Sequence, residues 1–392
     1  MRAGLRRRLA DRACRALLAI LPPSLASWGW AVRCEVASIP DDSKALLFAL
    51  DSLFGLMPRA VASRLPQLFM LLIRYGGCFR GGTITMTIAH ALTRRPRTLG
   101  IVCAVCAVAL GLLYLALAGA PARYLAINVA ALAIGLAVLA MPGRLATAGQ
   151  QWAGAASAAG AIALLATALV GADVDGAARW VRLSGFVIQP SLILLPVMLV
   201  AFSRSRSTLA TASIVAAAAA MAVQPDRAMA GMLVLSLAAI ATLRRDTHVL
   251  VALAASVASF AVTLARADTL PTSPYVDQIV YSSFDIHAVA GMAVWVGLAT
   301  LLVPALVGWH RDAGNRAVYA AFGAAWTGAI VAAAIGNYPT PIVGYGGSAI
   351  IGYALSLLAL PRLAGAHAGA VPQASDEMDS PLSDRHLRVE LA

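Results

Sequence analysis

The chain has 392 residues, of which 60% are hydrophobic and only 12% are charged, and its formal net charge is +12. A soluble domain is about 25% charged and less than half apolar. The composition therefore excludes an ordinary soluble enzyme, a disordered chain, a collagen-like fibre and a secreted disulfide scaffold. Apolar runs without apolar/polar alternation also disfavour a β-barrel. We therefore predict an all-α, polytopic membrane protein.

Residues 1–98 are predicted to form a basic helical module in the cytoplasm or at the membrane interface. They contain fourteen arginines and Lys44 against five acidic residues. A basic segment before the first long apolar run favours a cytoplasmic N-terminus and contact with anionic membrane lipids. Asp41 is suited to begin a helix, and residues 61–73 are expected to be amphipathic and interfacial. Because no nucleic-acid-binding module accompanies the charge, we expect no nucleic-acid partner.

About ten transmembrane helices are predicted in a membrane domain that spans residues 99–361. The apolar segments cover residues 99–119, 122–141, 153–172, 185–202, 208–223, 228–243, 247–265, 286–308, 315–336 and 342–360. Abundant Ala, Gly and Ser lets such helices approach one another closely. An even number of spans returns the C-terminus to the cytoplasm. Residues 362–392 are polar and are expected to form a disordered cytoplasmic tail.

Four polar segments lie on the predicted outer side of the membrane. They cover residues 178–191, 224–227, 266–285 and 337–348. Polar and ionisable groups at membrane depth are costly, so a set of them on one side indicates a site. The alternative is that these loops are polar only because they are solvated. That alternative explains Gln189 and Gln224 poorly, since each precedes a proline where an apolar segment begins or ends.

Each of the four segments contains a short motif. The motifs are, in chain order, Arg179-Trp180 with Gly185 and Gln189-Pro190-Ser191; Gln224-Pro225-Asp226; Leu270-Pro271 with Asp277; and Pro339 through Ser348, which ends in Tyr345-Gly346-Gly347-Ser348. In this order they resemble the SEDS family (shape, elongation, division and sporulation) of RodA/FtsW-like lipid II polymerases. The corresponding family motifs are R-W-x-x-x-G…Q-P-S-E, Q-P-D, L-P-E-x-H-T-D and P-L-P-F-I-S-Y-G-G-S. The resemblance covers about residues 99–361.

The resemblance implies a peptidoglycan glycosyltransferase that polymerises lipid II at the outer face of the bacterial inner membrane, in cell shape or division. A single-span penicillin-binding transpeptidase would be its partner. Asp277 occupies the place of the family's catalytic acid group, where it would accept the proton of the attacking hydroxyl. Cations would stabilise the departing pyrophosphate, and a divalent cation such as Mg²⁺ is left open. The implied substrate-binding residues are Arg179, Trp180, Arg182, Gln189, Ser191, Gln224, Asp226, Arg227, Asp285, Tyr345, Gly346, Gly347 and Ser348.

The chain also departs from the family pattern. Leu192 stands where the family has Glu after Q-P-S, and Tyr275-Val276 replace His-Thr before the loop aspartate. The family's nearby lysine is also missing. The lost glutamate and lysine favour the alternative of a non-catalytic relative that acts as a scaffold or lipid sensor. A transporter of lipid-linked substrate is a third alternative, although no inverted repeat is visible. For Asp285, capping of the next helix is an alternative to a role in the site.

Overall fold

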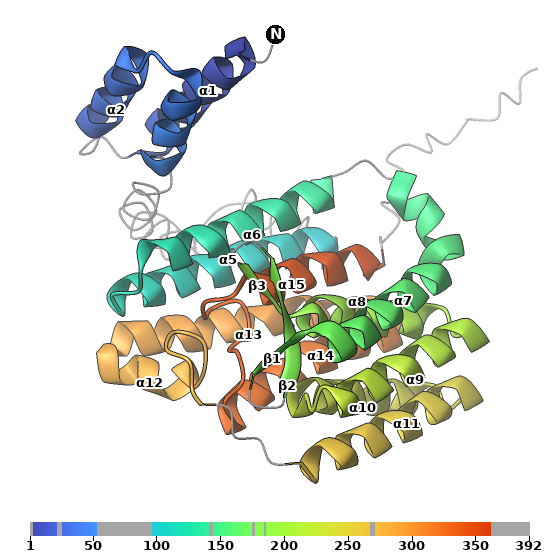
Figure 1. Cartoon of the computed structure of the whole chain (residues 1–392). Helices are drawn as coiled ribbons and strands as arrows, with labels where there is room; N and C mark the ends of the chain where they lie inside the picture. The colour runs from blue at the N-terminus through green and yellow to red at the C-terminus, as the bar shows by residue number, and fades with distance from the viewer. Residues whose placement is uncertain are drawn as a thin grey trace, which may run out of the picture. The chain divides into compact units, whose positions relative to one another are not determined.

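The computed structural model describes residues 3–21, 26–52, 96–140, 144–174, 177–183, 186–266 and 271–361. Most of these residues are helical, which confirms the predicted all-α class (Figure 1). The segment 61–73, predicted to be interfacial, and the predicted tail 362–392 lie outside the described residues.

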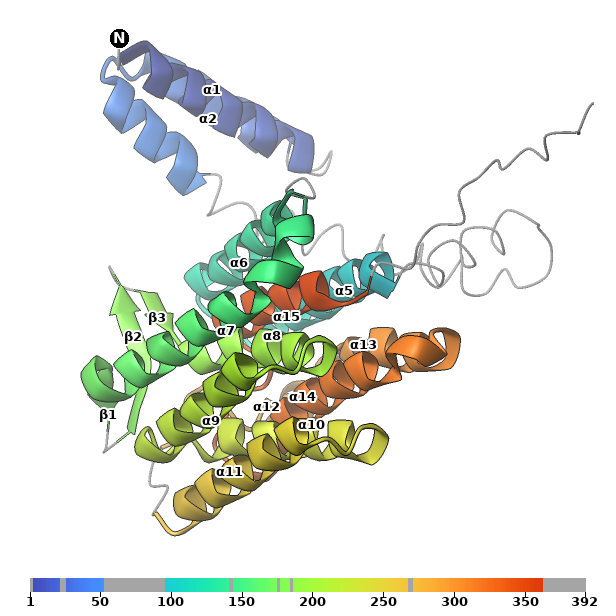
Figure 2. The same cartoon turned by 90° about the vertical axis from the view of Figure 1, so that its right-hand side faces the viewer.

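Each of the ten predicted apolar segments contains a helix, and a short helix, α12, precedes the eighth (Figures 1 and 2). The helices are α5 (Pro96–Leu117), α6 (Ala122–Ala140), α7 (Arg144–Val170), α8 (Pro190–Arg204), α9 (Thr208–Val223), α10 (Arg227–Leu243), α11 (Thr247–Leu264), α12 (Ile279–Ile286), α13 (Ala288–Arg311), α14 (Arg316–Ile335) and α15 (Gly347–Ala359). A 3-10 turn, Ala313–Asn315, leads into α14.

Five helices in the described part of the chain are long and apolar enough to cross a membrane. They are α5, α6, α11, α13 and the segment Ala313–Ile335, which includes α14. Large apolar side chains remain exposed on the helices, among them Val170 at 84%, Leu169 at 81% and Ile335 at 80%. Exposing apolar surface to water costs about 25 cal/mol per Å², so these faces suit the hydrocarbon of a bilayer. The lengths and surfaces of the helices are those of a membrane protein.

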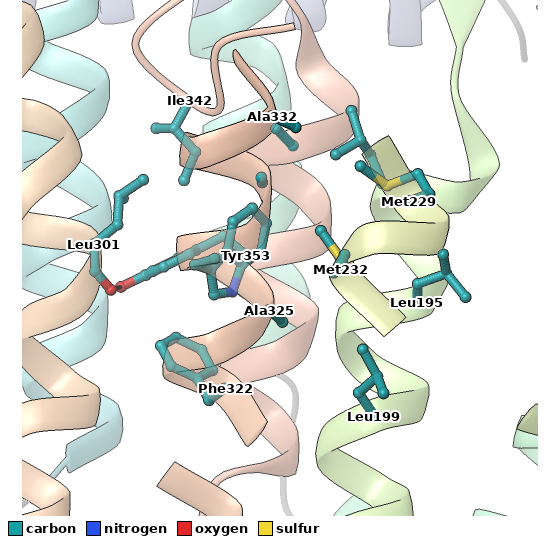
Figure 3. Packing of buried hydrophobic residues seen from close by; sticks show 14 of the residues in the cluster. Leu195, Leu199, Met229, Met232, Leu301, Phe322, Ala325, Ala332, Ile342 and Tyr353 are labelled. Carbon is teal, nitrogen blue, oxygen red and sulfur yellow. Dashed lines mark hydrogen bonds between the residues drawn. The ribbon is translucent and has the colours of Figure 1, made fainter. Parts of the chain in front are cut away.

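One cluster of buried side chains joins the helices of the bundle. Figure 3 shows Tyr353 of α15 within it, with Leu301 of α13 on one side and Met232 of α10 on the other. The Tyr353 hydroxyl donates a hydrogen bond of 3.0 Å to the Leu301 carbonyl. A Cβ at Gly352 would lie 2.1 Å from the carbonyl oxygen of Leu192. Glycine at this position therefore lets α15 pack directly against the backbone of α8.

The segment between α7 and α8 forms a small antiparallel sheet that the sequence did not predict. Strands β1 (Ala172–Val174), β2 (Ala177–Leu183) and β3 (Phe186–Ile188) lie in the order β1-β2-β3. In the β2–β3 hairpin, Arg182 pairs with Val187 and Leu183 with Phe186. Because β3 ends one residue before Gln189, the hairpin sets the point at which α8 begins.

The N-terminal residues form three short helices: α1 (Ala3–Ile20), α2 (Ala26–Ser38) and residues 42–52. Their shared core consists of small and medium side chains, including Ala10, Cys14, Val36 and Ala45. The Asp41 carboxylate accepts hydrogen bonds from the Ser43 and Lys44 backbone N–H groups at 2.7 and 3.2 Å, so the predicted helix start is confirmed. The Lys44 and Ser43 N–H groups also lower the pKa of Asp41.

Candidate functional site

A buried carboxylate lies where the first two motif segments meet. Asp226 is fully buried and caps the N-terminus of α10, accepting a hydrogen bond from the Met229 N–H at 3.2 Å. Its second oxygen accepts from Gln189 Nε2 at 3.1 Å and from Ser191 Oγ at 3.2 Å. Both donors belong to the first turn of α8 or precede it. The carboxylate therefore joins the N-termini of two helices, where the helix dipoles favour a negative charge.

The fourth motif segment, residues 337–348, contacts the same residues. The Gln189 N–H donates to Ser348 Oγ at 3.0 Å, and Ser348 lies in the first turn of α15. Residues Gln189, Ser191, Asp226 and Ser348 are each 0–9% exposed, and we call them the buried cluster. The cluster brings together predicted site residues that are as far as 159 positions apart in the sequence.

Arg179 ties the sheet to the same region. It lies on β2, is 4% exposed, and its guanidinium donates to the Pro225 carbonyl. The same guanidinium lies over the Tyr338 ring, 5.8 Å from its centroid. Arg179 thus contacts the second and fourth segments, and hydrogen bonding to the backbone commits part of its guanidinium to holding them in place.

The third segment is joined to the fourth through the backbone around Asp277. Asp277 and Pro339 form an isolated antiparallel bridge. Beside it, the Thr340 N–H donates to the Val276 carbonyl at 2.9 Å, and the Tyr345 N–H donates to the Tyr275 carbonyl at 2.7 Å. We call residues 273–278 the Asp277 turn. All four motif segments are therefore joined by contacts, which their order along the chain could not show.

The Asp277 side chain is half-buried and sparsely bonded. Its Oδ2 accepts one hydrogen bond, from the Ser273 N–H at 2.8 Å. No cation among the described residues lies within ion-pair distance of it. Burial raises the pKa of Asp277, and the Ser273 N–H offsets this only in part. The result is a carboxylate with free lone pairs and increased basicity, as a general base requires.

The backbone around this carboxylate is held in unusual conformations. Tyr275 and Gln278 have φ of 65° and 58°, and Ile342 in the facing loop has φ of 67°. Left-handed backbone costs energy for residues other than glycine, and for β-branched Ile342 most of all. Such strain persists only where surrounding contacts enforce it, and it is concentrated at functional sites.

Two residues that the sequence did not single out complete the arrangement. Asn128 of α6 is fully buried, and its amide donates to the Gly344 carbonyl at 2.8 Å and accepts from the Gly346 N–H at 3.1 Å. Tyr124 stacks on Tyr345 with ring centroids 3.8 Å apart. Asn128 was detectable as a polar residue inside an apolar segment. No sequence signal pointed to Tyr124.

The two glycines of the fourth motif have different roles. Gly346 has φ of +153°, a conformation that favours glycine, and it precedes α15. At Gly347 an added Cβ would lie 3.0 Å from the Ala131 side chain of α6, so this position lets the two helices approach closely.

Other predicted site residues lie apart from these contacts. Asp285 is exposed within α12, and the cap of α13 is instead His287, whose Nδ1 accepts from the Val289 N–H at 3.1 Å. The capping alternative for Asp285 was therefore wrong, because α13, the helix of the eighth segment, begins at Ala288, three residues after Asp285. Arg182 is also exposed.

Three more candidates are occupied by local contacts. Arg227 donates to the Arg266 carbonyl at 2.9 Å, which joins α10 to the end of α11. Gln224 donates to the Leu164 carbonyl of α7 at 2.8 Å. Trp180 lies on β2 opposite Ala172. The hydrogen bonds of Arg227 and Gln224 therefore join neighbouring helices.

No group of three or more His, Cys, Asp or Glu residues suited to a metal ion occurs among the described residues. We therefore assign no metal ligands. Comparison of the chain with protein-family models, with curated proteins and with solved structures found no match.

Proposed function

We propose that the chain is a SEDS-type peptidoglycan glycosyltransferase that polymerises lipid II at the outer face of the bacterial inner membrane. It would act in cell shape or division beside a single-span penicillin-binding transpeptidase. The observation that carries the proposal is the convergence of the four motif segments around Asp277 and the buried cluster.

In the proposed reaction Asp277 acts as the base. It would take the proton of the acceptor hydroxyl as that oxygen attacks the anomeric carbon of the lipid-linked donor. Its raised pKa and free lone pairs suit this role. A single displacement that uses one carboxylate inverts the anomeric configuration, from an α-linked donor to a β-linked polymer. The buried cluster holds the helices in place and takes no part in proton transfer.

The proposal requires all ten apolar helices to cross the membrane. Five of them meet the length and composition expected of a span, and α8, α9, α10, α15 and the apolar part of α7 are shorter. Short helices are tolerated in a packed bundle, because neighbouring helices and local bilayer thinning accommodate the mismatch. With the basic N-terminus in the cytoplasm, ten crossings would return the C-terminus to the cytoplasm and put the Asp277 turn outside.

One observation favours a non-catalytic relative that acts as a scaffold or lipid sensor. Leu192, which stands in place of the family's glutamate, is 3% exposed and belongs to the apolar core. Leucine supplies no carboxylate at this position, so the site lacks the acidic group that the family has there. Under this alternative the converging segments would bind lipid II without reacting.

The test is polymerisation of labelled lipid II by purified protein in liposomes, with its transpeptidase partner supplied. Asp277→Asn is nearly isosteric but cannot accept a proton near neutral pH, so its rate should fall about 10²–10⁴-fold. Asp285→Asn, in exposed α12, is the matched control and should retain most of the rate. Equal rates for wild type and Asp277→Asn would remove the catalytic assignment. Lipid II binding without polymer from wild type would support the non-catalytic alternative.

A further inference from the structure

The N-terminal helices carry positive charge that the proposed reaction does not use. Five of the eighteen residues of α1 are arginine and only Asp11 is acidic. Arg7 is held by hydrogen bonds of 2.8 Å to the Ile39 and Ala37 carbonyls. Arg8 and Arg12 are exposed, and no hydrogen bond or ion pair with another described residue engages them. These two guanidinium groups are available to an external anion.

An open hollow between α1 and α2 concentrates part of this charge. Its lining includes Arg7 and Arg8 from α1 and Arg33 from α2, with Asp11 as the only acidic residue. Arg33 lies 4.0 Å from the Asp11 carboxylate. Three guanidinium groups around one carboxylate leave a net positive charge. Arginine is suited to phosphate because its planar fork donates two parallel hydrogen bonds.

Exposed aromatic side chains lie on α2, and one of them contacts an arginine that lines the hollow. Trp28 and Trp30 of α2 are 62% and 55% exposed, and the Arg33 guanidinium lies over the Trp30 ring at 5.4 Å. Leu47 on the helix 42–52 is 67% exposed. Tryptophan is enriched at the level of lipid headgroups, where its ring meets apolar groups and its N–H meets water. Arginine and exposed tryptophan on one small module are typical of an interfacial helix.

We propose that the N-terminal helices bind the anionic headgroups of the membrane in which the chain resides. A lipid phosphate would occupy the hollow beside Arg8 and Arg33, with the indoles of Trp28 and Trp30 at the headgroup level. Lipid is favoured over other polyanions because the helices are covalently joined to membrane-embedded segments. The membrane surface is therefore always present at high effective concentration. This inference does not depend on the glycosyltransferase proposal.

The experiment uses the full chain in nanodiscs of phosphatidylcholine, alone or mixed equally with phosphatidylglycerol, with part of the lipid brominated. Subtracting the emission of the Trp28→Phe/Trp30→Phe variant from that of wild type isolates these two indoles. We expect brominated lipid to quench this difference signal in anionic nanodiscs. The quenching should be much weaker in neutral nanodiscs and at high salt, because salt screens the attraction.

Charge variants identify the site. Each arginine near an anionic surface contributes about a fivefold factor in binding, so Arg8→Gln/Arg33→Gln should weaken the anionic-lipid partition about 25-fold. Lys44→Gln, a single basic residue outside the hollow, is the control and should have a small effect. Circular dichroism checks that the helices remain folded. Equal quenching in neutral and anionic nanodiscs, or no effect of Arg8→Gln/Arg33→Gln, would overturn the proposal. A response of these indoles to RNA but not to anionic lipid would overturn it as well.

Discussion

Asp226 and Asp277 are the two acidic residues at which the motif segments meet, and their surroundings differ. Asp226 is fully buried and accepts three hydrogen bonds, from Met229, Gln189 and Ser191. Asp277 is half-buried and accepts one, from the Ser273 N–H. The first carboxylate has its lone pairs occupied by its neighbours. The second keeps its lone pairs for an incoming proton.

The backbone that holds each acid also differs between the two regions. The buried cluster is built on the first turns of α8, α10 and α15, which regular helices hold rigidly. The Asp277 turn has strained backbone at Tyr275 and Gln278. Pro225, next to Asp226, also has a positive φ, of 24°, so the contrast between the two regions lies in the regular helix ends and in the bonding of the acid. This contrast is common where a rigid scaffold supports a reactive group.

A cysteine introduced into each region should differ completely in its reaction with a labelling reagent. In a variant without the native cysteines, Ser273→Cys is expected to react with an impermeant maleimide in intact spheroplasts. Ser191→Cys, 1% exposed in the wild-type cluster, should react only after denaturation. Ser205→Cys, at the opposite end of α8, should react only after lysis. Labelling of Ser205→Cys in intact spheroplasts would place the Asp277 turn in the cytoplasm and contradict the proposed topology.

Stability should depend far more on Asp226 than on Asp277. Asp226→Ala removes the acceptor of three hydrogen bonds. Gln189 Nε2 keeps its bond of 3.3 Å to Ser191 Oγ, but the Met229 N–H and the Ser191 hydroxyl lose their acceptor, and an unsatisfied buried donor costs about 1–3 kcal/mol. We therefore expect the free energy of unfolding to fall by about 3 kcal/mol or more. Asp277→Ala removes one hydrogen bond from a half-buried group, so its cost should be about 1 kcal/mol or less. SDS-induced unfolding followed by tryptophan fluorescence measures both. Equal losses would mean that the two carboxylates have the same structural role.

Asn128 should affect activity through the position of the facing loop. Asn128→Ala removes the hydrogen bonds to Gly344 and Gly346, and displacement of a positioned group by about 1 Å costs about 100-fold in rate. We expect a loss of about 10- to 100-fold in kcat/KM for polymerisation. Asn315→Ala is the matched control, because its amide also makes two hydrogen bonds, both to Asp312, at the far end of α13. A similar loss in both variants would indicate general destabilisation.

The dependence of the polymerisation rate and of stability on pH should be the smallest of the predicted effects. A base must be ionised to act, so the rate should rise with pH through the pKa of Asp277. Burial raises this pKa, with partial opposition from the Ser273 N–H, so the midpoint should lie above the usual value of 3.8. The contribution of Asp277 to the free energy of unfolding should instead fall as pH rises. The contribution of Asp277 is fully present below pH 3.8 and is lost as pH rises through its higher folded pKa. Asp277→Asn should abolish this dependence of stability, measured by SDS unfolding at several pH values.

The membrane class, the ten helical segments and the helix start at Asp41 could be predicted from the amino-acid sequence. These features depend on local properties: the length and hydropathy of a run, and a side chain that reaches an N–H two or three residues later. The sequence also placed Gln189, Asp226, Asp277 and Ser348 in polar segments between the apolar runs, because polarity along the chain is a local property. It did not predict the sheet, since strands of three residues are too short for a periodic pattern.

Which of these residues contact one another depends on the packing of the helices, which the sequence did not predict. The bond between Asn128 and Gly344 spans 216 positions, and that between Gln189 and Ser348 spans 159. Such contacts depend on how helices pack, including the close approach of α15 to α8 at Gly352. The distinction between Asp226 and Asp277 arises there as well. Both are acids in polar loop motifs, and only the folded chain determines how many donors surround each carboxylate and how far water is excluded from it.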